Sequence, residues 1–158
     1  IEVVGFLGAR FNQGLDCQTT VMAIPTPGHA KDLTCLFFPE QKYLFSGDMY
    51  ISKSLKYLRS DENLSQLIAS LRKLIELDFD ILFCPHRGIV EQGKKALAEK
   101  LENLLALCHN SQRLMQDGLD EVEIVNKLLG PEDRLAKISK FNISKGNLIR
   151  QAMTFNQF

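Results

Sequence analysis

The sequence has 158 residues, and its 19 lysine and arginine residues are balanced by 19 aspartate and glutamate residues. A chain of this length can form one domain with a buried core, whereas zero net charge provides no overall attraction for a nucleic-acid backbone. The longest apolar runs are far shorter than the roughly 20 residues of a membrane-spanning helix, so we expect a soluble protein with no membrane contact.

The first half of the sequence, up to about Gly47, has the composition of consecutive β-strands. Short apolar runs alternate with Gly, Pro and Asn, which is typical of strands joined by turns. The predicted strands cover residues 2–7, 19–24, 33–38 and 43–46. Residues 39–42 predict a hairpin turn, and the Pro-Thr-Pro-Gly segment at 25–28 predicts an irregular loop that leads directly to His29.

The middle of the sequence predicts a helix followed by a strand. From Asp61 to about Asp78, leucine and isoleucine recur at helical spacing, and Ser60 or Asp61 can cap the helix. A short apolar strand then covers residues 80–84, and Pro85 follows it. His86 is therefore expected just beyond the C-terminal end of a strand, which is a common place for site residues in layered α/β folds.

Beyond Gly88 the sequence predicts helices alone. A long helix should run from about Glu91 to Gln116, and two or three shorter helices should follow, with caps at Asp120 and Ser144. We therefore expect two regions, a β-rich domain at residues 1–90 and a helical C-terminal region at residues 91–158.

The cysteines and the start of the chain indicate the cellular setting. The four cysteines, at positions 17, 35, 84 and 108, form no CxxC pair and lie in apolar stretches, as reduced and buried thiols do. The first five residues have neither an initiator methionine nor a signal segment. We expect a cytoplasmic protein, and a fragment of a longer one.

Three loops that follow apolar strands carry imidazole or carboxylate groups. They contain His29, Asp48 and His86, within the sequences TPGHAKD (26–32), LFSGD (44–48) and CPHRG (84–88). Zinc in a hydrolase takes imidazole nitrogens and carboxylate oxygens and keeps one position open for water. A single loop histidine is more often a surface or capping residue, so the joint pattern carries the prediction.

In order and spacing, TPGHAKD, LFSGD and PHRG resemble the later metal-binding motifs of the metallo-β-lactamase superfamily. The resemblance implies an α/β (α+β) fold, namely the C-terminal half of an αββα sandwich followed by a helical appendage. It also implies a zinc site in which His29 binds one metal, Asp48 bridges two metals and His86 binds the second. Asp32 would support a ligand or fix its loop.

The C-terminal helices resemble, less specifically, those of the branch that contains glyoxalase II-like and β-lactamase-like protein 2-type hydrolases. The resemblance implies hydrolysis of a small-molecule thioester, ester or phosphodiester by a metal-bound hydroxide. Tyr50 and Lys53, which follow Asp48, are candidate substrate-binding residues.

One motif of that family is absent. The H-x-H-x-D-H motif, which supplies further ligands to both metals, does not occur among these residues, and the third histidine, His109, falls within the predicted long helix. We therefore expect this chain to hold at most one zinc ion weakly, or none, and to be inactive alone.

Two other functions stay open from the sequence. The first is a non-catalytic binding or regulatory domain on the same scaffold. The second is part of a ribonuclease, because Lys137, Lys140, Lys145 and Arg150 provide the helical tail with positive charge that could contact RNA. Half of a two-sheet sandwich would expose an apolar face, so we also expect self-association or pairing with the missing N-terminal half.

Overall fold

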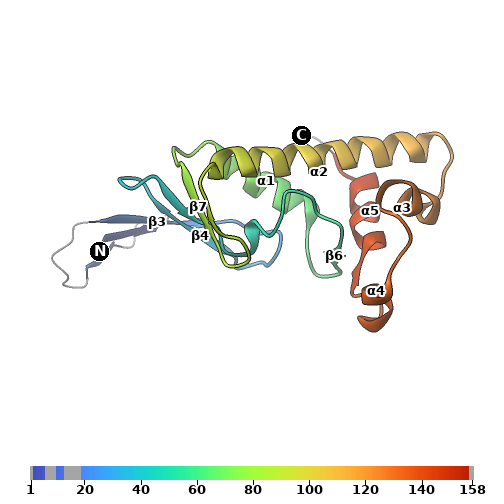
Figure 1. Cartoon of the computed structure of the whole chain (residues 1–158), viewed down its shortest axis with the longest axis horizontal. Helices are drawn as coiled ribbons and strands as arrows, with labels where there is room; N and C mark the ends of the chain where they lie inside the picture. The colour runs from blue at the N-terminus through green and yellow to red at the C-terminus, as the bar shows by residue number, and fades with distance from the viewer. Residues whose placement is uncertain (1, 6–9, 13–18, 157–158) are drawn as a thin grey trace.

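The structure is a computed structural model that describes residues 2–5, 10–12 and 19–156. The strands are β1 (Glu2–Gly5), β2 (Arg10–Asn12), β3 (Thr20–Pro25), β4 (Thr34–Phe38), β5 (Tyr43–Phe45), β6 (Leu58–Arg59), β7 (Ile81–Cys84), β8 (Gly88–Val90) and β9 (Ile143–Ser144). The helices are the 3-10 turn η1 (Gly47–Met49), α1 (Leu64–Ile75), α2 (Gly93–Gln116), α3 (Glu121–Leu129), α4 (Arg134–Ile138) and α5 (Lys145–Met153). The sheet lies at one end of an elongated molecule, and α2 runs from the sheet to the smaller helices at the other end (Figure 1).

Within the described residues, seven strands form one mixed sheet in the order β2-β1-β3-β4-β5-β7-β8. The strands β3, β4 and β5 form an antiparallel meander, and β7 returns parallel to β5 after the α1 crossover. The sequence predicted helices alone beyond Gly88, which is wrong for residues 88–90 and 143–144, because β8 pairs with β7 in a tight hairpin and β9 pairs with β6 in a separate two-stranded sheet.

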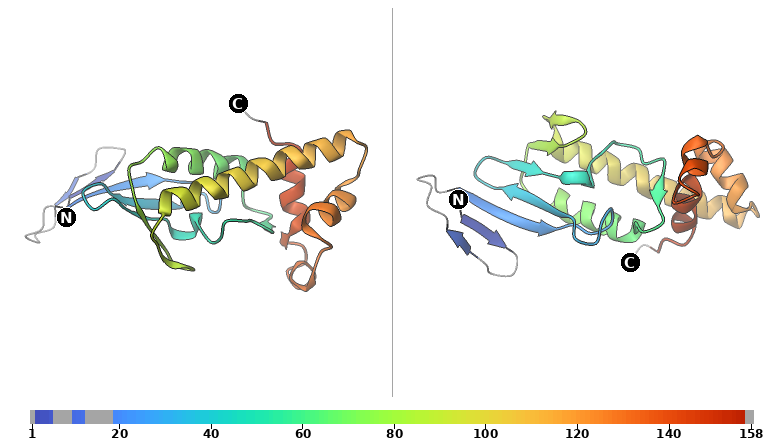
Figure 2. Two further views of the ribbon diagram at one scale, coloured as in Figure 1. Left: turned by 45° about the horizontal axis from the view of Figure 1, so that its top comes forward. Right: turned by 90° about the horizontal axis from the view of Figure 1, so that it is seen from below.

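Helices α1 and α2 cover one face of this sheet (Figure 2). Alternate side chains of β4, β5 and β7 point toward the helices, so that Cys35, Leu44 and Leu82 are fully buried. Helix α1 is the amphipathic helix that the sequence predicted, although its cap is neither Ser60 nor Asp61. The side chain of Asn63 caps it by accepting a hydrogen bond from the amide of Gln66 at 2.9 Å.

The opposite face of the sheet carries an aromatic cluster. Phe45 and Phe83 stack with their ring centroids 4.5 Å apart, and Phe38 and Tyr43 pack against this pair at 5.2 Å each. Phe45 is 40% exposed, which is unusual for a phenylalanine in the middle of a sheet. We refer to Phe38, Tyr43, Phe45 and Phe83 as the aromatic face.

The helical end of the molecule has a small core of its own. Leu114 at the end of α2 packs with Ile124, Val125 and Ile149 from α3 and α5. Asp120 and Ser144 cap α3 and α5, as predicted. The first two-thirds of α2 contributes to the main core beside the sheet, so α2 links the two predicted regions, and their boundary near residue 90 stays a prediction.

Three cysteines in the described part of the chain, Cys35, Cys84 and Cys108, are buried free thiols, while Cys17 lies outside the described residues. Burial raises the pKa of the Cys35 and Cys108 thiols to about 11, which makes both thiols unreactive near neutral pH. Among residues 2–5, 10–12 and 19–156, no helix has the length and apolar character needed to cross a membrane.

Candidate metal centre

The loop that carries His29 is fastened to α1. The amide of Asn63 donates a hydrogen bond to the Gly28 carbonyl at 2.8 Å, and the Ser70 hydroxyl donates to the Pro27 carbonyl at 2.7 Å. Gly28 has a φ of 140°, a conformation that side-chain-bearing residues rarely adopt. A glycine here lets the loop backbone lie directly against the helix, and this contact fixes the position of the His29 backbone.

Asp48 lies in the 3-10 turn η1, which follows β5. Gly47 begins the turn with a φ of 49°, and the amide of Ser46 donates to the Phe83 carbonyl at 2.9 Å. Behind Asp48, the side chain of Met49 is completely buried, and its carbonyl accepts a hydrogen bond from Lys100 Nζ at 2.6 Å. The turn is therefore held from β7 on one side and from α2 on the other.

His86 lies at the tip of the β7–β8 hairpin. Cys84 pairs with Gly88 across the two strands, so residues 85–87 form the connecting loop. Gly88 has a φ of 68°, which is typical of a three-residue hairpin loop. Arg87 Nε donates to the Ile51 carbonyl at 3.0 Å and ties this loop to the segment that follows Asp48.

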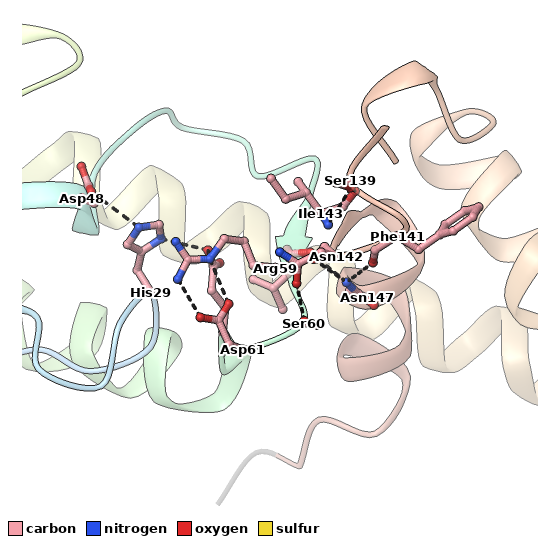
Figure 3. A network of polar contacts seen from close by, with 12 residues as sticks. His29, Asp48, Arg59, Ser60, Asp61, Ser139, Phe141, Asn142, Ile143 and Asn147 are labelled. Atoms are coloured by element: carbon pink, nitrogen blue, oxygen red, sulfur yellow. Dashed lines mark hydrogen bonds and ion pairs between the residues drawn. The ribbon is translucent and has the colours of Figure 1, made fainter. Parts of the chain in front are cut away.

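The structure brings the three predicted ligands together around one carboxylate. His86 Nε2 lies 3.0 Å from Asp48 Oδ1, and His29 Nε2 lies 3.5 Å from Asp48 Oδ2. The two imidazoles thus approach opposite oxygens of Asp48, as expected for ligands of a bridging carboxylate. Figure 3 shows the His29–Asp48 contact at one end of a network of polar contacts.

A fourth side chain, which the sequence did not single out, contacts the other nitrogen of His29. Glu62 Oε1 lies 3.0 Å from His29 Nδ1, and Glu62 is 9% exposed. Burial raises the pKa of Glu62, while His29 and Arg59 act in the opposite direction. A carboxylate at Nδ1 holds the imidazole proton there and turns the lone pair of Nε2 toward Asp48.

The distances from Asp48 to the two imidazoles can be compared with the separation of two ligands on one zinc ion. Two ligands of one tetrahedral zinc ion, each about 2.0 Å from it, are roughly 3.3 Å apart, and the two contacts of Asp48, at 3.0 and 3.5 Å, lie on either side of this value. A lone pair of His29 Nε2 facing a carboxylate oxygen is also unfavourable unless a proton or a cation lies between them. The donor chemistry and these pairwise distances therefore fit zinc.

The same residues do not make a closed cage. In the part of the chain that the structure describes, no group of three or more His, Cys, Asp and Glu side chains surrounds a single position that could hold a metal ion. Around Asp48, each imidazole faces a different oxygen. A metal ion between Asp48 and either imidazole would need additional ligands to complete its coordination shell.

The remaining predicted site residues lie at the edge of this cluster. Asp32 is exposed, and its backbone carbonyl accepts a hydrogen bond from the Thr34 hydroxyl at 3.2 Å. Its predicted support of a ligand stays a prediction, since Glu62 is the carboxylate that contacts His29. Tyr50 is almost completely buried, and Lys53 forms an ion pair with Glu99 at 2.5 Å.

His29 lines a cavity of about 840 Å³. Tyr50 and Lys53 line it together with other residues of the segment that follows Asp48. Its basic lining residues are Lys53, Lys56, Arg59 and Arg87, whereas Glu62 is its acidic one. The size is within the range of small-molecule sites, and two of the four basic residues are already paired with carboxylates, Lys53 with Glu99 and Arg59 with Asp61.

The basic side chains of the helical tail are only partly available to a ligand. Lys145 Nζ donates to the backbone carbonyls of Leu129, Gly130 and Pro131. Arg150 forms two hydrogen bonds with Glu121. The exposed residues Lys137 and Lys140 therefore remain as the part of the predicted RNA-binding tail that faces solvent.

Comparison with known proteins places this cluster in a family context. A family model described as the metallo-beta-lactamase superfamily matches residues 14–86. A hydroxyacylglutathione hydrolase from Bartonella tribocorum is 37% identical over 68 residues, which cover 42% of this chain and 26% of the relative. An atrochrysone carboxyl ACP thioesterase from Aspergillus fumigatus is 28% identical over 52% of this chain and 25% of the relative.

A solved structure has a similar arrangement of strands and helices. A metallo-beta-lactamase family protein from Thermus thermophilus matches 85% of this chain and 44% of its own length, with a TM-score of 0.63 and 17% identity. At this identity the likeness shows the fold alone. The chain spans about a quarter of the length of the curated relatives that it matches first, with shares between 25% and 28%.

Proposed function

We propose that this chain, which matches the metallo-beta-lactamase superfamily over residues 14–86, supplies part of the active site of a zinc-dependent hydrolase. One observation carries the proposal: His29 and His86 present Nε2 to opposite oxygens of Asp48, while Glu62 holds the far nitrogen of His29. His29 and Glu62 of this cluster also line the cavity.

His29, Asp48 and His86 would hold the metal. When bound, zinc would act as a Lewis acid that polarises a carbonyl or phosphoryl group and activates water. Asp48 would join the two halves of the site because it reaches both imidazoles. Glu62 would keep His29 in the tautomer with Nε2 unprotonated, and the basic cavity, with Tyr50 and Lys53 in its wall, would orient the substrate.

We propose that this part of the site is not sufficient for turnover. The sequence has only three histidines, and the third, His109, is exposed on α2 far along the chain. We propose that the remaining ligands come from an H-x-H-x-D-H segment outside these 158 residues, and that this chain alone holds at most one zinc ion weakly. The aromatic face supports the same proposal, because a second β-sheet packed on it would bury Phe45 and its neighbours.

Thioesters are the first substrate class to test. Two relatives carry names that specify thioester hydrolysis, a hydroxyacylglutathione hydrolase and an acyl carrier protein thioesterase. Lys56 and Arg87 in the cavity wall would contact a thioester whose thiol part is anionic. A ribonuclease is less well supported, because Lys145 and Arg150 already have partners within the protein. A cytoplasmic location fits the free thiols of Cys35, Cys84 and Cys108.

The coding region upstream of Ile1 provides the decisive test. An H-x-H-x-D-H motif there, together with zinc-dependent hydrolysis of a hydroxyacylglutathione thioester by the longer chain, is the expected result. Asp48→Asn in the longer chain should abolish turnover, whereas Asp117→Asn, in the turn after α2, should not. Absence of the motif together with absence of turnover would instead favour a non-catalytic binding domain on the same scaffold, and turnover that survives Asp48→Asn would contradict the metal-binding role of Asp48.

A further inference from the structure

Lys100 is a lysine in the middle of the hydrophobic core. It lies on α2, and its side chain is 2% exposed. Its neighbours on the inward face of the helix, Leu97, Leu101 and Leu104, are apolar and belong to the main core. Lysine is almost never fully buried without a partner, because removing its ammonium group from water costs desolvation free energy.

The ammonium group has one specific partner near the candidate site. Lys100 Nζ donates a hydrogen bond of 2.6 Å to the carbonyl of Met49, the residue directly after Asp48. Burial lowers the pKa of Lys100 to about 8, and Glu62 and Cys84 act against this effect. Glu62 contacts His29, and Cys84 lies two residues before His86, so both groups belong to the same part of the protein as the candidate ligands.

The turn that carries Asp48 needs this contact. The turn η1 is three residues long, and within it the amide of Met49 donates to the Ser46 carbonyl at 3.1 Å. On the side of Ser46 the turn is held by β7, through the Phe83 carbonyl. On the other side it is held by Lys100, across 51 residues of sequence. Further along the segment Arg87 contacts the Ile51 carbonyl and Cys84 contacts the Tyr50 carbonyl, but Lys100 is the side chain that contacts the residue directly after Asp48.

We infer that Lys100 is a positioning residue that fixes the Asp48 turn through the Met49 carbonyl and so keeps the Asp48 carboxylate between His29 and His86. This inference rests on the proposed function, since a shared carboxylate has a purpose only in a metal site. It explains why the core retains a lysine where a methionine of similar volume would fill the space without desolvation of a charge.

The test compares three variants of the full 158-residue chain. Lys100→Met removes the hydrogen bond and keeps the volume, Lys100→Arg keeps charge and donors, and Lys94→Met removes an exposed lysine from the same helix as the matched control. In zinc titrations, Lys100→Met should bind about 10-fold more weakly than the unaltered chain or worse, as substitutions behind metal ligands do. Lys100→Arg should recover most of this affinity, and Lys94→Met should change nothing.

A second measurement needs no metal. In NMR spectra of the metal-free chain, Lys100→Met should shift the imidazole signals of His86 and His29 and leave those of His109 in place. Lys100→Arg and Lys94→Met should leave all three histidines nearly unchanged. If Lys100→Met does not fold, Lys100→Gln, which is too short to reach the Met49 carbonyl, decides the same question.

The outcomes separate this inference from the proposed function. Unchanged zinc affinity and unchanged imidazole signals in folded Lys100→Met would overturn the positioning role. The positioning role would also be overturned if folded Lys100→Arg loses as much zinc affinity as Lys100→Met, because the charge and the hydrogen-bond donors would then be irrelevant. If the unaltered chain binds no zinc, the proposed function fails for this chain, and the imidazole signals still decide whether Lys100 positions Asp48.

Discussion

Substitution of Gly28 by alanine should destabilise the protein strongly. A Cβ atom at this position would lie 2.5 Å from both the backbone nitrogen and Cα of Leu67, and 2.8 Å from its Cβ. These atoms belong to α1 and cannot rotate away. Either the loop or the helix must move, and the hydrogen bond from Asn63 to the Gly28 carbonyl would be strained as a result.

The magnitude has two sources. Forcing extra volume into a packed contact costs about 1–3 kcal/mol, and a side chain in a disfavoured backbone conformation costs about 1–3 kcal/mol. Gly28 has both problems, since its φ is 140°. Gly118 has only the second, because its φ is 90° and a Cβ atom there would have no neighbouring atom within 4 Å. Gly118→Ala is therefore the matched control.

Urea unfolding followed by circular dichroism measures the free energy of unfolding of both variants. We expect the free energy of unfolding to fall by roughly 2–6 kcal/mol in Gly28→Ala and by the conformational part alone, roughly 1–3 kcal/mol, in Gly118→Ala. Gly28→Ala should also weaken zinc binding, because His29 is the next residue. Equal stability losses in the two variants would refute the close packing of this loop on α1.

Three further predictions follow from the same contacts. Glu62→Gln should weaken zinc binding by about 10- to 100-fold, because it removes the carboxylate that fixes His29; unchanged affinity in a chelator competition would contradict this. Lys100 has a pKa lowered from 10.5 to about 8 in the folded protein, so the unfolded chain binds more protons between these values. Relative to Lys100→Met, the unaltered chain should therefore gain about 3 kcal/mol of stability in urea as pH increases from 8 to 10.5, while the raised thiol pKa values of Cys35 and Cys108 lower the stability of both chains above pH 9. Phe45→Ser should shift any self-association of the chain toward monomer in sedimentation experiments, and a strictly monomeric unaltered chain would argue against an interface on the aromatic face.

The sequence was informative about the site because its three candidate ligands follow strands. His29, Asp48 and His86 each come soon after a short apolar run, and strands of one sheet deliver such residues to a common edge. The pattern of apolar residues also predicted α1 and α2, because both helices bury one face against the sheet. It did not predict β8, since a three-residue strand after a histidine loop leaves too short a pattern to recognise.

Glu62 and Lys100 were missed for a different reason. Glu62 lies in the short segment before α1, where an acidic residue is usually interpreted as part of a helix cap. Lys100 lies in a lysine-rich stretch that resembles a solvated helix surface. A signal for Lys100 was nevertheless present, because positions 97, 100, 101 and 104 share one face of a helix, and the other three are leucines. A lone lysine on an apolar helix face is as informative as a histidine in a loop, because its burial requires a partner.

Zinc content and turnover of the purified chain test the central claim most directly. After dialysis the chain should retain less than one equivalent of zinc and should not hydrolyse a hydroxyacylglutathione thioester. When zinc is added back, a single weak binding event should appear in calorimetry, and Asp48→Ala should abolish it. Two retained equivalents with rapid turnover would contradict the account, and so would zinc binding that survives the loss of Asp48.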